Sequence, residues 1–377
     1  MQNYKKILLA TMSFDIGGVE THVLELATCL KNLGYVPIVV SNGGVYTREL
    51  LHRGITHIKL PLHDKNPKHI LDSYILLKKL ILKEQIDIVH AHARIPAFTL
   101  GLLHKHMHFP FVTSAHSNFN TLNPIYKFNS NWGQASIAVS HDLKQYLIDK
   151  YKIEPKNILV SINGINPNTF QKNLDTHDIE EAFRIDRSKT IIGHISRLDK
   201  SRALAAFQLV ELAPKLYTLF PNTRLLIVGD GNYFEHIKTK ANYANSKLGL
   251  EYIILTGAST EVNKFLAISD IFVGVSRAAL EAMCMRCPTI LAGNEGYIGI
   301  FDPSKLDLAI ESNFTCRGEV LSNPKLLLED LTTLLRMSKT ERDNLGEYSR
   351  EVVVNHYSVE KMTYDHIKLY DKVWKKG

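Results

Sequence analysis

Short apolar runs alternate with longer amphipathic segments along most of this 377-residue chain. The short runs are rich in β-branched and aliphatic residues and predict buried strands, whereas the segments between them carry apolar residues at helical spacing. The first of these helices has one apolar face, formed by Val23, Leu26, Ala27 and Leu30. A repeated strand–helix alternation predicts parallel β-sheets covered by helices. The expected strands span residues 6–10, 36–41, 86–90, 111–114 and 136–139, and then 190–194, 225–228, 252–255, 271–273 and 289–291.

The pattern occurs twice, and a polar segment separates the two series. Residues 161–189 contain Asn163-Gly164 and Asn166-Pro167-Asn168 followed by charged residues, which is the turn chemistry of a linker. We place the boundary at residues 170–188, which predicts one α/β domain over residues 1–170 and a second over 185–357. The tail is helical in character, and we expect residues 358–377 to cross back to the first domain. Its expected packing positions are Tyr357, Met362, Ile367, Tyr370 and Val373.

The fold class also predicts where a ligand binds. In doubly wound sheets, ligands bind at the carboxyl ends of the strands, next to helix N-termini that favour anions. We therefore expect two Rossmann-like domains that face each other across a central cleft, with an anionic ligand bound there. The residues at the strand ends are the ones to examine for function.

The amino-acid composition excludes fewer classes of function than the strand–helix pattern does. Apolar residues make up 45% and charged residues 22%, and 45 Lys and Arg against 38 Asp and Glu give a formal charge of +7. This basic excess suits an anionic small molecule, a membrane surface or a nucleic acid, but no aromatic residues are interleaved with basic ones to support a nucleic-acid partner. No run reaches the roughly 18 to 20 apolar residues that span a bilayer. The four cysteines are too few for a disulfide framework, so we expect free thiols and a cytoplasmic protein.

Two adjacent glycines, Gly17 and Gly18, stand between the first expected strand and its helix. Without side chains, they would let backbone N–H groups approach a phosphate or a sugar closely. The alternative is a strand–helix turn that requires a positive φ. The glycines do not form the Gly-x-Gly-x-x-Gly fingerprint of dinucleotide binding, and Gly229-Asp230-Gly231 has no third glycine, so a dehydrogenase is disfavoured.

Two arginines follow the first strand of the second series. Arg197 comes just after the strand, and Arg202 lies five residues later, at the entrance of the next helix. Two guanidinium groups at a strand end can clamp a diphosphate and neutralise the charge of a leaving group. The alternative is a pair of solvated surface side chains, the usual state of arginine. The position at the strand end favours the diphosphate.

A further strand, ending near residue 274, opens an apolar helix that contains Glu281. Glu281 has two interpretations: a carboxylate in the first helical turn, stabilised by the helix N-terminus, or an acceptor of two hydrogen bonds from a ribose diol. Cys284 and Cys287 form a Cys-x-x-Cys pair in the same segment. Because there is no second pair and the helical periodicity explains both thiols, packed side chains are favoured over a zinc site.

Histidines alternate at His90 and His92 and again within residues 104–108. Alternating side chains of a strand face the same side and could bind a transition metal, but no acidic or thiolate side chain is close to them in sequence. We therefore favour solvated or hydrogen-bonded histidines, with residues 104–108 at the surface. His116 differs in position, because it comes just after an expected strand, where a ligand is expected.

Seven segments of the chain together resemble glycosyltransferase family 4, the retaining sugar transferases of the GT-B fold. Each segment is short, but their order and spacing extend almost from end to end. The resemblance implies two Rossmann-like domains and a nucleotide-sugar donor. The segments are Gly17-Gly18-Val19-Glu20-Thr21-His22 with Gly34, Asp87-Ile88-Val89-His90-Ala91-His92, Ala138-Val139-Ser140, Asn163-Gly164-Ile165-Asn166, Ser196-Arg197-Leu198-Asp199, Leu226-Ile227-Val228-Gly229-Asp230-Gly231, and Leu280-Glu281-Ala282-Met283 with Cys287-Pro288.

The resemblance also implies roles for single residues. By this resemblance, Gly17 and Gly18 lie over the donor diphosphate, and Arg197 binds that diphosphate. Glu281 holds the ribose, and His116 stands beside the transferred sugar.

The chain departs from the family pattern at two places. The family usually has a lysine five residues after the arginine, and here Arg202 keeps the charge but changes the hydrogen-bond geometry. The family's paired glutamates, eight positions apart, are reduced to Glu281, because Val273 stands at the first place. Ser276 or Arg277 is then a candidate substitute that contacts the donor.

We therefore predict a retaining transferase that moves a sugar from a UDP-hexose or UDP-N-acetylhexosamine to a cell-envelope glycan or glycolipid, with His116, Arg197 and Arg202 as catalytic residues. Two aspartates separated by one residue, with which many sugar transferases hold a divalent metal, do not occur, so we expect no metal and no cofactor. The basic balance suits a lipid-linked acceptor and peripheral contact with the inner membrane surface. Two alternatives are a GT-B nucleotide-sugar epimerase or hydrolase, which needs cleft carboxylates, and a catalytically silent GT-B protein that binds a nucleotide or has a structural role, which Val273 keeps open.

Overall fold

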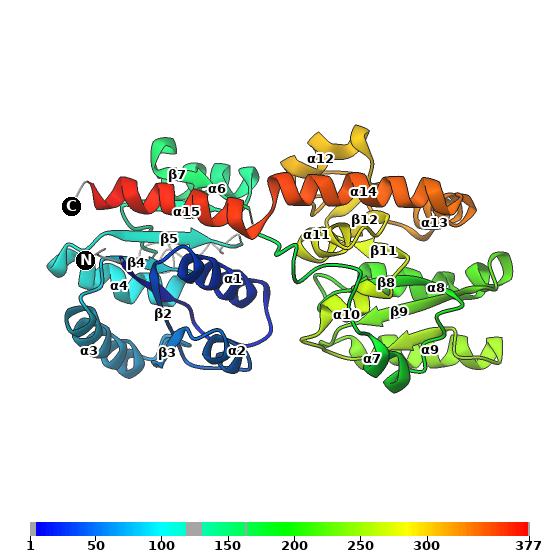
Figure 1. Cartoon of the computed structure of the whole chain (residues 1–377), viewed down its shortest axis with the longest axis horizontal. Coiled ribbons are helices and arrows are strands. Elements are labelled where there is room, and N and C mark those ends of the chain that lie inside the picture. Colours follow the sequence, from blue (N-terminus) through cyan, green and yellow to red (C-terminus); the bar gives the residue numbers. More distant parts are fainter. Residues whose placement is uncertain (1–4, 118–129, 163, 376–377) are drawn as a thin grey trace. The chain divides into compact units, whose positions relative to one another are not determined.

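The computed structural model describes residues 5–117, 130–162 and 164–375, and the chain forms two compact units (Figure 1). Unit 2 is Ile165–Ser358, and unit 1 consists of the residues before it and after it. The chain therefore leaves unit 1 once and returns to it with its last helix. The change of unit at Gly164 lies within the expected linker, residues 161–189, and a few residues before the boundary expected at 170–188. Asn163 of the expected turn lies outside the described residues.

Within its described residues, unit 1 has a seven-stranded sheet in which every pair is parallel. Its strands, in sheet order, are β3 (Thr56–Lys59), β2 (Val36–Ser41), β1 (Lys6–Ala10), β4 (Ile88–Ala91), β5 (Phe111–Ala115), β6 (Ala135–Ala138) and β7 (Ile158–Val160). Its helices are α1 (Gly18–Asn32), α2 (Thr47–His52), α3 (Pro67–Glu84), α4 (Arg94–Met107), α6 (His141–Tyr151), the short 3-10 helix Pro155–Asn157, and α15 (Val359–Trp374).

The two faces of this sheet are covered by different helices, which explains why its strands are apolar on both sides. Alternate residues of β1 point in opposite directions. Ile7 and Leu9 pack in a core that contains residues of α1 and α15, whereas Leu8 and Ala10 pack in a core that contains residues of α3 and α4. The sheet is thus sandwiched between two helical layers, and its carboxyl edge is left for the loops.

Unit 2 has a six-stranded sheet within its described residues, with one antiparallel edge strand. In sheet order the strands are β10 (Ile253–Leu255), β9 (Thr223–Val228), β8 (Thr190–Ile195), β11 (Ile271–Gly274), β12 (Thr289–Gly293) and the antiparallel β13 (Gly296–Ile300). The helices are α7 (His177–Ala182), α8 (Leu204–Leu219), α9 (Phe234–Leu248), α10 (Val262–Ala267), α11 (Ser276–Cys284), the 3-10 helix Pro303–Lys305, α12 (Leu306–Glu311), α13 (Pro324–Arg336) and α14 (Lys339–His356).

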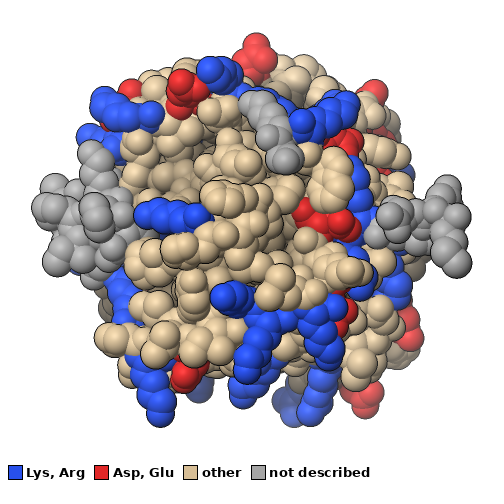
Figure 2. Space-filling view, turned by 90° about the vertical axis from the view of Figure 1, so that its left-hand side faces the viewer, with Lys and Arg blue, Asp and Glu red and all other residues tan. Residues whose placement is uncertain are grey.

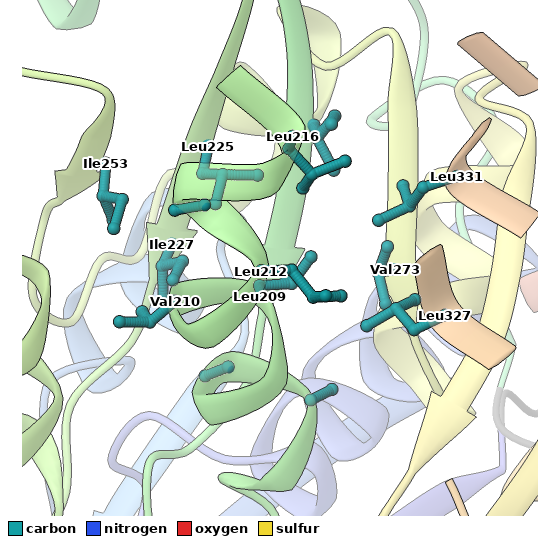
Figure 3. Close-up of a cluster of buried hydrophobic side chains, with 14 of the residues drawn as sticks. Leu209, Val210, Leu212, Leu216, Leu225, Ile227, Ile253, Val273, Leu327 and Leu331 are labelled. Carbon is teal, nitrogen blue, oxygen red and sulfur yellow. The ribbon is translucent and has the colours of Figure 1, made fainter. Parts of the chain in front are cut away.

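The main core of unit 2 packs one sheet face against α8, α9 and α13. Figure 3 shows part of it, with Val273 of β11 pointing toward Leu327 and Leu331 of α13. Residues of α7 and α10 pack on the other face of the sheet. Both faces are therefore covered, as in unit 1.

The C-terminal helix expected over residues 358–377 is α15, which belongs to unit 1 and is separate from the helix before it. α14 ends at His356, Tyr357 and Ser358 form a buried connection, and α15 begins at Val359. In α15, Met362 and Tyr370 are buried in the core of unit 1. Among the helices that the structure describes, none is both long and apolar enough to cross a membrane.

Candidate functional site

The predicted site residues of unit 2 follow two neighbouring strands. β8 and β11 are parallel, and Ile192 and Gly193 of β8 pair with Ile271 and Phe272 of β11. The carboxyl ends of parallel neighbours lie at the same edge of a sheet. The loop with Arg197 and the start of α11, with Ser276, therefore leave the sheet from adjacent positions.

Arg197 and Arg202 share one carboxylate, that of Asp199. The Nε of Arg197 lies 3.0 Å from Oδ2 of Asp199, and Nη1 of Arg202 lies 3.6 Å from the same atom. The arginine side chains are 63% and 50% exposed, so their ion pairs add little to folding stability. Asp199 holds the two guanidinium groups near each other while leaving most of their hydrogen-bond donors open to an anion. Asp199 was expected only as part of a family segment, although its spacing of three residues from Arg202 was a signal for an ion pair.

The loop that contains the arginines is held by the glycines of the next strand–helix connection. Leu198 is fully buried; its amide donates to the carbonyl of Asp230 and its carbonyl accepts from the amide of Tyr233. Gly229 has a φ of +141°, and a Cβ there would overlap the carbonyl oxygen of Ser196. Gly229 and Gly231 do not form a dinucleotide fingerprint. Instead, the absence of a side chain at Gly229 lets its backbone pack closely against the loop that contains Arg197.

The start of α11 is a strained backbone segment. Ser276, its first residue, has a φ of +57°, which is unfavourable for a residue with a Cβ. Its amide donates to the carbonyl of Phe314, which also has a positive φ. Such strain is concentrated at functional sites, and here it lies beside the predicted donor-binding residues.

Glu281 is the sixth residue of α11, so the interpretation as a carboxylate in the first turn is wrong. Its Oε1 instead lies 2.8 Å from Nε of Arg277, one turn earlier, and both side chains are nearly buried, at 9% and 13% exposure. The sequence predicted the helix but not this pair. The pair fixes the direction of the Glu281 carboxylate toward the first turn of α11.

Val273 lies inside β11 and is fully buried in the main core (Figure 3). The residue eight positions before Glu281 therefore points into the core rather than toward a ligand. A carboxylate at this place would be an unpaired charge in an apolar core, which is strongly disfavoured. The absence of a glutamate at residue 273 therefore follows from how β11 packs.

His194 is a site residue that the sequence analysis missed, because nothing in the pattern of its strand distinguishes it. It is buried in β8, with Nδ1 2.8 Å from the carbonyl oxygen of Val273 and Nε2 2.9 Å from Oγ of Ser196. Burial lowers the pKa of His194 to about 4, so the ring is neutral near pH 7. It connects β8 to β11 just below the edge where Arg197 emerges.

In unit 1, Gly17 and Gly18 begin α1. Gly17 is the N-cap, with an extended φ of −173°, and Gly18 is also outside the left-handed region, so the interpretation as a turn that needs a positive φ is wrong. A Cβ added at Gly18 would meet nothing within 4 Å. A Cβ at Gly17 would instead overlap the carboxylate of Glu20. The backbone is thus open at Gly18, as the close-approach interpretation requires, but at Gly17 it is covered by the Glu20 side chain.

His116 follows β5, and His92 follows the neighbouring strand β4, so the two rings meet at the carboxyl edge of the sheet. Nε2 of His116 lies 3.3 Å from Nδ1 of His92. Burial, with a smaller effect of His366, lowers the pKa of His116 to about 3. His90 and His92 are buried rather than solvated. Of the two states expected for these histidines, solvated or hydrogen-bonded, His90 has the second, because both of its ring nitrogens are hydrogen-bonded.

The four cysteines are free thiols, as expected. Cys284 and Cys287 are buried, and burial raises the pKa of Cys284 to about 11. Within the described residues, the side chains placed to hold a metal ion are instead His22, His92 and His116, and separately His63, Asp64 and His69.

Known proteins similar to this chain cover nearly all of it. Residues 16–169 match the family model described as "Glycosyltransferase Family 4", and residues 175–352 match the model described as "Glycosyl transferases group 1". A crystal structure of a glycosyltransferase from Rickettsia africae is 26% identical and superimposes with a TM-score of 0.80, covering 100% of both chains.

Two curated relatives match over shorter stretches. The phosphatidylinositol N-acetylglucosaminyltransferase gpi3 subunit of Schizosaccharomyces pombe is 25% identical over 57% of this chain and 48% of its own length. The UDP-Gal:alpha-D-GlcNAc-diphosphoundecaprenol alpha-1,3-galactosyltransferase of Escherichia coli is 26% identical over 74% of this chain and 77% of its own length. The chain thus spans about half of the first relative and three quarters of the second. With both halves matched in order and a fold of two parallel-sheet α/β units, this chain belongs to glycosyltransferase family 4, in the GT-B class.

Proposed function

We propose that this protein is a retaining glycosyltransferase that moves a sugar from a UDP-sugar to a lipid-linked acceptor. The observation that carries the proposal is the pair of half-exposed guanidinium groups on Asp199, at the same sheet edge as the helix with Glu281. The relatives support the two ligands. The name of the Escherichia coli relative gives UDP-galactose and a diphosphoundecaprenol-linked sugar, and that of the yeast relative gives a phosphatidylinositol.

Different residues of unit 2 bind different parts of the sugar-nucleotide donor. Arg197 and Arg202 bind the diphosphate, since a guanidinium group forms bidentate hydrogen bonds with phosphate oxygens. Glu281 accepts hydrogen bonds from the ribose hydroxyls, and Ser276 and Arg277 lie beside it at the start of α11. In unit 1, Gly17, Gly18 and His116 are the residues that the family resemblance assigns to the donor.

The proposed transfer needs no protein nucleophile. The bond between the anomeric carbon and the diphosphate oxygen breaks, and an acceptor hydroxyl oxygen bonds to that carbon on the same face of the sugar. The departing diphosphate takes the proton of the acceptor hydroxyl. Arg197 and Arg202 stabilise the negative charge that develops on the diphosphate.

Metal independence is part of the proposal, because the guanidinium groups supply the charge that a divalent ion would otherwise bring to the diphosphate. We expect activity to persist in EDTA. Loss of activity in EDTA with recovery in Mg²⁺ or Mn²⁺ would overturn this part.

The experiment that tests the function is a donor panel. UDP-, GDP- and ADP-sugars are titrated into the full chain by calorimetry and thermal shift, in EDTA, and released nucleoside diphosphate is then measured with a polyprenyl-diphosphate sugar as acceptor. We expect a UDP-sugar to bind at micromolar strength, worth about 8 kcal/mol, and the nucleoside diphosphate to be released. If no sugar nucleotide binds, the catalytically silent alternative replaces the proposal.

For the acceptor side, we propose that α3 rests on an anionic membrane surface. Leu71, Ile75 and Leu82 are exposed by 58%, 43% and 62%, and their spacing places them on one side of the helix. Lys78 and Lys79 are exposed beside them. Apolar side chains flanked by lysine are the features of a helix that lies in a membrane interface. Figure 2 shows the side of unit 1 that faces left in Figure 1, where many Lys and Arg and fewer Asp and Glu side chains lie around a central uncharged area.

Replacing Leu71, Ile75 and Leu82 by serine should therefore reduce binding to vesicles of phosphatidylglycerol and phosphatidylethanolamine by about tenfold or more, because each of these apolar side chains contributes buried area when it enters the interface. Binding is measured by co-sedimentation. The matched control replaces Leu219, Val320 and Leu321, which are exposed on unit 2, and should bind like the parent. Equal binding of both variants would contradict the assignment of α3.

A further inference from the structure

Five histidines gather in unit 1 at the carboxyl ends of β4 and β5, on the sheet face covered by α1 and α15. The proposed function uses only one of them. Their neighbouring ring centroids are 3.9 to 5.6 Å apart. The five are His22 of α1, His90 and His92 at the end of β4, His116 after β5, and His366 of α15.

Two of these histidines have hydrogen bonds that explain them as structural. His90 uses both ring nitrogens, at 2.8 Å from the hydroxyl of Tyr370 and 2.8 Å from that of Ser114. Nδ1 of His366 donates to the carbonyl of Met362 within its own helix. Nε2 of His366 and Nε2 of His92 are both buried without a hydrogen-bond partner among the described residues. His92 approaches His116 through its other ring nitrogen, Nδ1, so it is Nδ1 that a shared ion would use.

The other three rings lie close enough together for their nitrogens to converge on one metal ion. One ring nitrogen from each of His22, His92 and His116 lies within 4.8 Å of the others. Zinc binds imidazole nitrogen at about 2.0 to 2.1 Å, so two nitrogens on a tetrahedral ion are about 3.3 Å apart. Nδ1 of His92 and Nε2 of His116 are 3.3 Å apart, which is long for a hydrogen bond and suits this geometry.

We infer that His22, His92 and His116 bind one divalent transition-metal ion, of the zinc, cobalt or nickel class that imidazole favours. Three imidazoles leave a fourth position for water or an anion. His116 is only half-buried, which gives an ion a route from solvent.

A second group could compete for the same ion. His63, Asp64 and His69 are half-exposed in the segment before and at the start of α3. The carboxylate of Asp64 already accepts hydrogen bonds from the amide of Asn66 and from Nδ1 of His69. Binding a metal there would break these bonds, and we therefore assign the ion to the buried triad.

The metal site has a consequence for the transferase that rests on the proposed function. An ion bound to Nε2 of His116 occupies the lone pair of that nitrogen. Contact of His116 with a donor sugar and metal binding then exclude each other. Metal binding itself is measured without substrate, so a failure of the proposed function leaves this test intact.

The test uses the full chain without a purification tag, dialysed against CoCl₂ or ZnSO₄ at pH 7.5. Bound metal is measured by atomic emission, and cobalt also by the intense visible absorption of four-coordinate sites. We expect the intense cobalt spectrum with one ion bound in the triad. His92→Ala and His22→Ala should each weaken this binding by at least about tenfold, because even second-shell changes at metal sites cost 10- to 100-fold.

Three controls keep the proposal falsifiable. His69→Ala removes the competing group, His57→Ala removes a half-buried histidine hydrogen-bonded elsewhere, and His106→Ala removes an exposed one. All three should keep the cobalt spectrum, and far-UV circular dichroism verifies that each triad variant is folded. An absent spectrum, or one lost in His69→Ala but kept in His92→Ala, would overturn the inference.

Discussion

Replacing Arg197 and Arg202 together by glutamine is expected to lower kcat/KM for sugar transfer by about 1,000-fold. Removing one preorganised donor from a developing negative charge costs about 10²- to 10³-fold in rate, and both guanidinium groups are assigned to the diphosphate. Their side chains are half-exposed or more, so the fold should tolerate the change. The measurement is release of UDP under steady-state conditions, together with the melting temperature of each variant.

The conservative and distant variants make this prediction specific. Arg202→Lys should retain activity within about tenfold, because a lysine keeps the charge at a place where the family usually has one. Arg224→Gln, at the opposite, amino end of β9, removes an arginine bonded to nearby carbonyls and should leave kcat/KM unchanged. Equal loss in Arg224→Gln and in the double variant would show a general charge effect and refute the diphosphate assignment.

The interior of each sheet could be predicted from the sequence, whereas several edges could not. All ten expected strands are present with bounds within two residues, because buried parallel strands are apolar on both faces. The unexpected strands, β3, β7 and β13, each lie at a sheet edge. β3 is Thr-His-Ile-Lys and half-exposed, and β13 contains two glycines. Edge strands have one free side, so their apolar pattern is weaker.

The candidate site was also predictable only in part: positions next to a strand could be predicted, whereas contacts between distant segments could not. Strand ends give the position of Arg197, Arg202 and His116 directly from the sequence. The contacts between different loops, such as that of Leu198 with Asp230, depend on which strands are neighbours in the sheet. The spacing of residues along the sequence does not predict them. The histidine cluster illustrates this limit, since α15 brings His366 beside residues more than 200 positions earlier.

Val273 shows how counting along the chain misled the interpretation of the site. Eight positions before Glu281 lies a core residue of β11, because α11 begins only five residues before Glu281. The hypothesis of a catalytically silent protein rested on the side chain at residue 273. Since that side chain is directed into the core (Figure 3), residue 273 does not take the place of a carboxylate that contacts the donor. This finding does not test the hypothesis of a silent protein, and Glu281 is the carboxylate whose role the next experiment measures.

Glu281→Ala should weaken UDP binding by about 100-fold. If the carboxylate accepts two hydrogen bonds from the ribose, each bond to a charged group contributes about 1.5 to 3 kcal/mol, and the loss of two corresponds to at least about two orders of magnitude in Kd. The change also removes the ion pair with Arg277, whose side chain is 13% exposed. Breaking a pair that is nearly buried destabilises the fold, so a lower melting temperature alone does not identify a ribose contact.

The ligand therefore provides the decisive comparison. The parent protein should bind UDP at least about tenfold more tightly than 2′-deoxy-UDP or 3′-deoxy-UDP, because each deoxy nucleotide loses one hydrogen bond to the carboxylate. In Glu281→Ala, this preference should disappear, so that the three nucleotides bind alike. A purely structural role of the Arg277–Glu281 pair would weaken all three equally and preserve the ratio. Calorimetric titration of parent and variant with the three nucleotides separates these outcomes, and an unchanged ratio would exclude Glu281 as the ribose ligand.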